Sequence, residues 1–172
     1  MRLNLGQIII QSILQLIPAL LLFWRLYLII AIVVVVKVCW LLHKNHILRK
    51  AGMPEIDRMS GDVFEKKIGM LFEKMGYKVQ YVGSHRGDFG SDLVIEKDGI
   101  RTVVQAKRHA HYIDGDAVRE AYAARNMYQA TKAMVVTNNY FSKAAKQLAA
   151  SDDVELWDRD ELARRVLRSR LS

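Results

Sequence analysis

Three polar residues, Asp92, Gln105 and Lys107, stand on either side of a turn that would bring them together. The segments that flank Asp98-Gly99 are rich in β-branched residues, and Asp-Gly between such segments is a strong signal for a two-residue hairpin loop. Counting outward from that loop places Asp92 opposite Gln105. Because side chains alternate across a sheet, all three polar side chains share one face, with Lys107 diagonal to Asp92. The spacing therefore predicts that an acid, an amide and an ammonium group converge.

The same trio also has a purely structural interpretation, because antiparallel strands commonly present an alternating polar face to water. Residues 83–91 are rich in glycine and bring a second carboxylate, Asp88, to the entrance of the strand. Further upstream, Glu65 stands beside an apolar stripe with helical spacing, so it is expected on a helix that packs on the core. Residue types alone leave Glu65 open as an exposed salt-bridging residue, and Asp88 as a brace for the loop.

Three histidines, His85, His109 and His111, raise the question of a transition-metal site. No cysteine and no matching acidic pattern accompany them, although zinc sites are built from such ligand sets. The pattern favours a solvated strand end over a zinc site.

Taken together, these motifs resemble the Mrr-type restriction endonuclease domain, a branch of the PD-(D/E)XK nuclease superfamily. The resemblance covers roughly residues 59–167. The superfamily pattern has an acid at the position of Gln105, and the Mrr branch typically has glutamine there, whereas Ser91 replaces the proline of the superfamily name. The landmarks are Ser60 to Glu65, Gly76-Tyr77, Gly87 to Asp92, Gln105-Ala106-Lys107, Val135 to Asn138 and Leu156-Trp157-Asp158.

The resemblance implies an α/β fold with a restriction-endonuclease-like mixed sheet flanked by helices. It also implies hydrolysis of phosphodiester bonds in DNA, in defence against foreign or modified DNA. Such chemistry needs a hard divalent cation, Mg²⁺ or Mn²⁺, held by oxygen ligands. The expected metal ligands are the side chains of Asp92, Gln105 and Glu65 and the backbone carbonyl of Ala106. The negative charge of Glu65 would replace the charge that the superfamily acid at position 105 normally supplies. The expected role of Lys107 is to orient the attacking water or stabilise the transition state.

The rest of the domain is expected to alternate strands and helices, with parallel strands after the hairpin. Start and stop signals predict a helix capped by Ser60 that ends near Gly76, a strand at 77–82, a helix capped by Asp114 or Asp116 that reaches about Tyr128, a buried strand at 133–137, a helix capped by Ser142, a strand at 154–157 and a helix begun by Asp158 or Asp160.

Residues 3–42 form a hydrophobic segment without a single acidic residue and with only two basic ones, Arg25 and Lys37. About 20 apolar residues suffice to span the hydrocarbon core of a bilayer. The segment is too long and too pure for a soluble core helix, and it lacks the short apolar region and cleavage site of a signal peptide. We therefore expect residues 1–42 to be a membrane anchor.

The number of crossings stays open at this point. Two helices could meet at a tight turn around Arg25, flanked by the interfacial aromatics Trp24 and Tyr27. A single helix from about Pro18 to Leu42 is the alternative, and the absence of Gly, Pro or Asn at Arg25 counts for it. We slightly favour two crossings.

Basic residues at 43–50 follow the hydrophobic segment directly, which favours a cytoplasmic domain on the inner membrane of the cell. The single cysteine, Cys39, lies in the anchor and excludes an intramolecular disulfide. All 18 acidic and 23 of the 26 basic residues follow the anchor, which gives this part a formal charge of +5. That excess suits a DNA backbone and an anionic membrane equally well.

The expected organisation is an anchor at 1–42, a juxtamembrane linker at 43–58 and a nuclease domain at 59–172. The leading hypothesis is a membrane-tethered, metal-dependent DNA endonuclease. The alternatives are a catalytically silent DNA-binding module of the same fold and a membrane-localised interaction protein. A homo-oligomer is compatible with each, and the presence of Asp92, Gln105 and Lys107 together favours retained chemistry.

Overall fold

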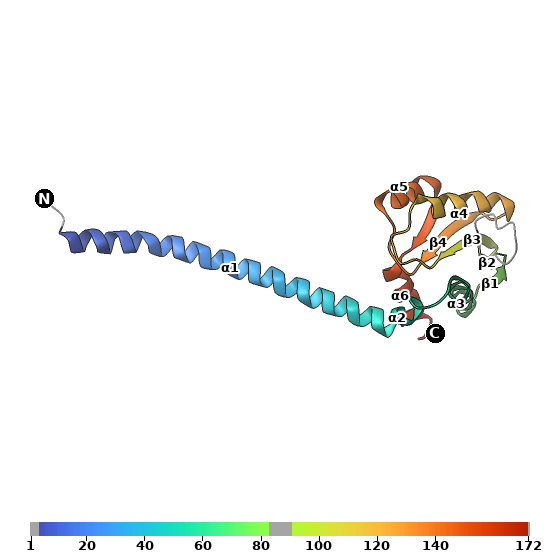
Figure 1. Cartoon of the computed structure of the whole chain (residues 1–172), viewed down its shortest axis with the longest axis horizontal. Helices are drawn as coiled ribbons and strands as arrows, with labels where there is room; N and C mark the ends of the chain where they lie inside the picture. The colour runs from blue at the N-terminus through green and yellow to red at the C-terminus, as the bar shows by residue number, and fades with distance from the viewer. Residues whose placement is uncertain (1–3, 83–90, 172) are drawn as a thin grey trace. The chain divides into compact units, whose positions relative to one another are not determined.

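The computed structural model of the chain describes residues 4–82 and 91–171. It divides the chain into two compact units, residues 1–45 and residues 46–172 (Figure 1). The elements in chain order are α1 (Leu5–Lys50), α2 (Met53–Ile56), α3 (Gly61–Lys74), β1 (Lys78–Tyr81), β2 (Leu93–Lys97), β3 (Ile100–Lys107), α4 (Gly115–Met127), β4 (Lys132–Thr137), α5 (Lys143–Asp152), β5 (Val154–Trp157) and α6 (Arg159–Arg168).

A five-stranded mixed sheet in the order β1-β2-β3-β4-β5 forms the centre of the second unit. The β1–β2 and β2–β3 pairs are antiparallel, whereas the β3–β4 and β4–β5 pairs are parallel. Lys97 pairs with Ile100 and Val94 with Val103, so the predicted hairpin register is confirmed. The two loop residues, Asp98 and Gly99, have φ of 53° and 75°, as a two-residue hairpin loop of the primed type requires.

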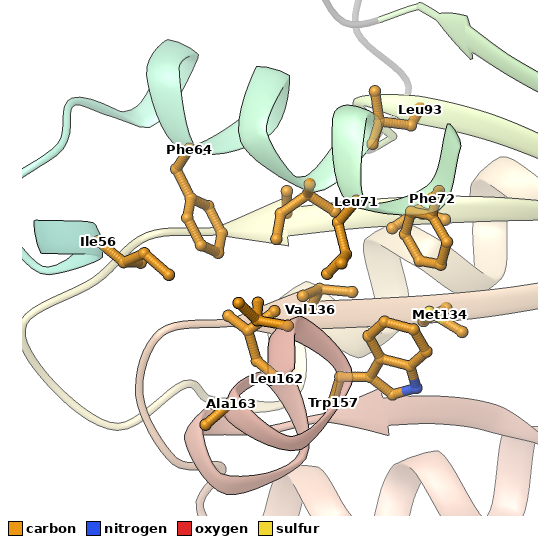
Figure 2. Packing of buried hydrophobic residues seen from close by; sticks show 14 of the residues in the cluster. Ile56, Phe64, Leu71, Phe72, Leu93, Met134, Val136, Trp157, Leu162 and Ala163 are labelled. Atoms are coloured by element: carbon orange, nitrogen blue, oxygen red, sulfur yellow. The ribbon is translucent and has the colours of Figure 1, made fainter. Parts of the chain in front are cut away.

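Helices cover both faces of the sheet: α3 and α6 lie on one face, and α4 and α5 on the other (Figure 1). Alternate residues of β3 point to opposite faces of the sheet. Val104 and Ala106 pack in the α3/α6 core, and Val103 packs in the α4/α5 core. Figure 2 shows the α3/α6 core, in which Phe72 packs against Trp157 with ring centroids 5.1 Å apart. This is the predicted mixed α/β architecture.

The predicted helix starts are found at the expected residues. Ser142 accepts a hydrogen bond from the amide of Ala145 and caps α5, and Asp158 accepts from two amides of the first turn of α6. Asp114 occupies the N-cap position of α4 and Ser60 that of α3. Capping hydrogen bonds thus mark the starts of α5 and α6, whereas Asp114 and Ser60 hold the N-cap position without a side-chain capping bond.

The first unit differs from the expectation of two helices, because α1 runs without interruption through Arg25 to Lys50. The predicted turn at Arg25 is therefore absent from α1, and that prediction was wrong. No helix-breaking residue stands there, and the helix accommodates Pro18 in its interior. By length and composition, one described helix, residues 9–50, could cross a membrane, with a mean hydropathy of 2.7 for its most apolar window and no part of that window buried.

The segment 43–58, expected as a linker, instead contributes to the domain core. Ala51, Met53 and Ile56 are no more than 1% exposed, and Leu48 packs against the same cluster. Their apolar side chains belong to the α3/α6 core, so the folded domain begins upstream of residue 59, where the family resemblance starts. Gly52 and Pro54 mark the start of the short helix α2, with Gly52 at its N-cap.

Candidate active site

Asp92 and Gln105 meet at one end of the central strands. Asp92 directly precedes β2, and Gln105 lies near the carboxyl end of β3. One carboxylate oxygen of Asp92, Oδ2, accepts hydrogen bonds from the Gln105 side-chain amide at 2.8 Å and from the Ala106 backbone amide at 2.7 Å. Asp92 is half-buried, whereas Gln105 is only 5% exposed. The hairpin register therefore brings these two predicted site residues into direct contact.

The amide oxygen of Gln105 is buried and has no hydrogen-bond partner among the described residues. An orphaned buried acceptor beside a carboxylate is costly unless a donor or a cation satisfies it. Carboxylate and amide oxygens are the ligands that Mg²⁺ prefers. The donor set thus fits a hard divalent cation, although the described residues contain no group of three or more His, Cys, Asp or Glu side chains placed to hold a metal.

Lys107 lies on the same face of β3 as Gln105, two residues further along the strand. Its ammonium nitrogen forms an ion pair with Oε2 of Glu120 in α4 at 2.8 Å, and both side chains keep more than a third of their exposure. Lys107 is therefore oriented by a carboxylate that the sequence analysis did not select. The only signal for Glu120 is its place beside the buried helix positions Ala117 and Ala121.

Glu65 belongs to α3, which covers the opposite face of the sheet from α4. The phenol of Tyr81 lies 3.5 Å from the carbonyl oxygen of Lys66, and Tyr81 pairs with Leu93, the residue after Asp92. This contact places the turn of α3 that carries Glu65 near the end of β1, and Glu65 is half-buried. Its expected role as a metal ligand stays a prediction.

Most of the glycine-rich loop, including Asp88 and His85, lies outside the described residues. Ser91, the residue that replaces the family proline, is buried and donates to the carbonyl oxygens of Leu93 and Val104 at 3.0 and 3.3 Å. Because the bond to Val104 crosses to the neighbouring strand, Ser91 fastens the chain next to Asp92.

A second polar cluster occupies the carboxyl ends of β3, β4 and β5. Asp57, which precedes α3, accepts two hydrogen bonds of 2.7 Å from the guanidinium of Arg159 and one of 2.9 Å from the side-chain amide of Asn138. Arg108, the residue after Lys107, donates to the backbone oxygen of Asp57 at 2.6 Å. Sequence analysis missed this cluster, because Asp57 lay in the expected linker.

The electrostatics of this cluster follow from the bidentate pair. The hydrogen bonds from Arg159 hold the pKa of the Asp57 carboxyl below its ordinary value, against the opposing effect of burial, and the Asn138 amide lowers it further. Reciprocally, the carboxylate raises the pKa of Arg159. Both groups therefore stay charged at neutral pH, and the pair fastens α6 to the segment that leads into α3.

The fold and site define a restriction-endonuclease-like α/β domain. Residues 56–166 match the Mrr_cat family model, described as a restriction endonuclease. The chain belongs to this family. No curated protein matches it.

The solved structures similar to the chain include the following two. The DNA modification-dependent restriction endonuclease AspBHI superposes with a TM-score of 0.56 at 16% identity, over 75% of this chain and 36% of that one. A protein of unknown function, AF1548, superposes with a TM-score of 0.52 at 22% identity, over 62% of this chain and 64% of that one. This chain therefore spans less than two thirds of either, and at these identities the likeness shows the fold alone.

We predict that Asp57→Asn lowers the free energy of unfolding at pH 7 by about 1–3 kcal/mol, because it leaves the Arg159 guanidinium without its charged partner. A lowered pKa in the folded state contributes stability above the ordinary carboxyl pKa and loses it as the pH falls through the folded value. The difference between wild type and variant should therefore shrink below about pH 4. Urea unfolding at a series of pH values measures it.

The matched control is Asp116→Asn, which removes the exposed ion pair to Arg119 on α4. It should cost no more than about 0.5 kcal/mol at pH 7. Equal losses in the two variants, or a difference that persists at pH 3, would contradict the structural role of Asp57.

Proposed function

We propose that this chain is a divalent-metal-dependent DNA endonuclease of the restriction type, anchored in the inner membrane with its domain on the cytoplasmic side. The observation that carries the proposal is the contact between Asp92 and Gln105, which leaves a buried amide oxygen beside a carboxylate. Asp92, the Gln105 oxygen and the Ala106 carbonyl would hold the ion, with Glu65 as the further carboxylate. When bound, a Mg²⁺ or Mn²⁺ ion neutralises phosphate charge and makes water a better nucleophile.

The side chains of the protein supply the rest of the chemistry. The Ala106 amide and the Gln105 amide fix the Asp92 carboxylate in one orientation, so little reorganisation is needed when the ion binds. Lys107 provides a fixed positive charge on the same face, and its ion pair with Glu120 holds the ammonium near the strand end. An ammonium in this position stabilises the charge that develops on a phosphate during hydrolysis.

DNA is the substrate that the proposal requires. The formal charge of +5 after the hydrophobic segment suits a phosphate backbone. A family described as restriction endonucleases supports the same substrate class and a defensive role.

The membrane proposal rests on α1. Nearly all of its described large apolar side chains are about half exposed or more, which is unfavourable in water on this scale. Its 46 residues exceed the roughly 20 needed to cross a bilayer. Because α1 is continuous through Arg25, we propose a single crossing, with the basic residues at 43–50 on the cytoplasmic side.

The test of the activity uses the full chain in neutral detergent, with supercoiled plasmid and Mg²⁺. Lys107→Ala should lower the cleavage rate by at least about 100-fold, because a fixed charge acts on the transition state more than on the fold. Asp92→Asn should in addition weaken Mg²⁺ binding in calorimetry. Lys132→Ala, an exposed lysine at the far end of the neighbouring strand, is the control and should cleave normally. A folded Lys107→Ala protein that nicks at the wild-type rate would remove Lys107 from the mechanism.

Two glutamates should separate by their effects. Glu65→Gln should lower both Mg²⁺ affinity and cleavage with little change in thermal stability, because only a charge is lost. Glu120→Gln breaks the ion pair to Lys107, so it should lower kcat and leave Mg²⁺ affinity unchanged. Calorimetry and steady-state kinetics on the two variants provide the comparison. A Glu65→Gln protein with normal affinity and rate would assign Glu65 to the solvated surface.

The anchor makes a prediction of its own. The full chain should stay with membranes through high-salt and alkaline carbonate washes, since salt screens surface charges beyond a Debye length of about 8 Å but does not reverse burial of apolar residues. A reporter fused to the N-terminus should be periplasmic. A cytoplasmic reporter would contradict the single crossing, and release into the salt wash would exclude the anchor altogether.

A further inference from the structure

A cavity of about 360 Å³ lies just beyond Lys107, at the carboxyl ends of the parallel strands. Its lining comes from the residues that directly follow three parallel strands: 108–110 after β3, 138–140 after β4, and Arg159 after β5, with Asp57 as the remaining wall. Ligands in α/β sheets commonly bind outside the carboxyl ends of parallel strands, where loops diverge. The cavity is thus in a position where binding is expected, and the proposed metal site does not use it.

The walls of the cavity are held by hydrogen bonds between and within the loops. Asn138 accepts from the amide of His109 at 2.8 Å, and Arg159 donates to the Asn138 carbonyl oxygen at 2.7 Å. Asn139 accepts from the amide of Tyr140 at 2.8 Å. Because the contacts tie the loops after β3 and β4 to each other and to α6, the cavity is preformed.

The charge of the lining is positive. Asp57 is the one carboxylate in it, and both of its oxygens already accept from Arg159, so these two groups neutralise each other. The ion pairs formed among the described residues do not include Arg108, whose Nε is buried without a hydrogen-bond partner there. The lining thus holds two guanidinium groups, Arg108 and Arg159, against one carboxylate. An excess of one guanidinium beside an imidazole and neutral amides favours an anion, and guanidinium matches the geometry of phosphate oxygens.

We propose that this cavity, which we call the phosphate pocket, binds a phosphate group of the DNA backbone next to the one that is cleaved. The inference rests on the proposed function, because Lys107 and Arg108 are consecutive residues on opposite faces of one strand end. Lys107 is the last residue of β3, and Arg108, His109 and Ala110 follow it, so the proposed metal site and the pocket lie at the same end of the sheet. In the proposal, a DNA strand that passes Lys107 continues along this end of the sheet, and Arg108 meets one of its neighbouring phosphates.

Ala110 offers the sharpest test, because it lines the pocket, is exposed and has no polar side-chain atom to lose. Ala110→Asp puts a negative charge at the pocket, and Ala110→Asn puts a neutral group of the same shape there. Binding of labelled duplex DNA is measured by fluorescence anisotropy on the full chain in detergent, with Lys107→Ala in every variant to prevent cleavage. The Asp variant should bind about tenfold more weakly than the Asn variant, because like charges oppose each other across an interface.

Arg108→Gln provides a second measurement. For this variant, the slope of the logarithm of the DNA-binding constant against the logarithm of the salt concentration should be shallower by about one. This change is the signature of one lost phosphate contact. Arg101→Gln removes the same charge from the opposite end of β3 and should leave DNA affinity within about twofold, since that end carries no phosphate in the proposal. Circular dichroism confirms that each variant is folded.

Calorimetric titration with inorganic phosphate identifies the source of the phosphate. Equal DNA binding by Ala110→Asp and Ala110→Asn, with phosphate heat lost only in the Asp variant, would assign the pocket to a free phosphate and overturn the DNA assignment. No difference in either titration overturns the pocket itself. Because binding is measured without cleavage, failure of the wild type to cut plasmid would count against the proposed endonuclease activity and not against the pocket.

Discussion

The site depends on one constraint, the register of the β2–β3 hairpin. Asp98 and Gly99 turn the chain in two residues with positive φ, and this fixes Val94 opposite Val103. The Asp92 carboxylate then reaches the amides of Gln105 and Ala106. A slip of one residue would turn every side chain of one strand to the other face, so the same register that buries the valines also assembles the site.

Glutamine at position 105 is the consistent choice for this geometry. Gln105 is almost fully buried and donates to Asp92 at 2.8 Å, where a second carboxylate would repel the first unless a cation or proton stood between them. The amide holds Asp92 in place without adding charge, and its buried oxygen has no hydrogen-bond partner among the described residues. On the other side of the same strand end, Arg108 opens onto a cavity whose single carboxylate is already neutralised by Arg159. Two polar sites of different character thus share one edge of the sheet.

Local signals in the sequence were sufficient for the elements and for the central contact. The Asp98-Gly99 dipeptide and the alternation beside it predicted the hairpin, and Ser142 and Asp158 marked helix starts that the structure confirms through capping hydrogen bonds. These predictions succeed because turns, caps and strand alternation involve residues a few positions apart. The turn expected at Arg25 failed for a local reason as well, since no residue there interrupts helical hydrogen bonding.

By itself, then, the sequence determined the hairpin, the pairing of Asp92 with Gln105, the face that Lys107 shares with them and the apolar character of α1. Tertiary structure alone decided that Lys107 meets Glu120, that Asp57 binds Arg159 across 102 positions of sequence, and that the expected linker is part of the core. Those contacts join separate elements across both layers of the sheet. Residue types and short-range spacing carry no record of them, because they depend on how α3, α4 and α6 pack on the sheet once the chain has folded.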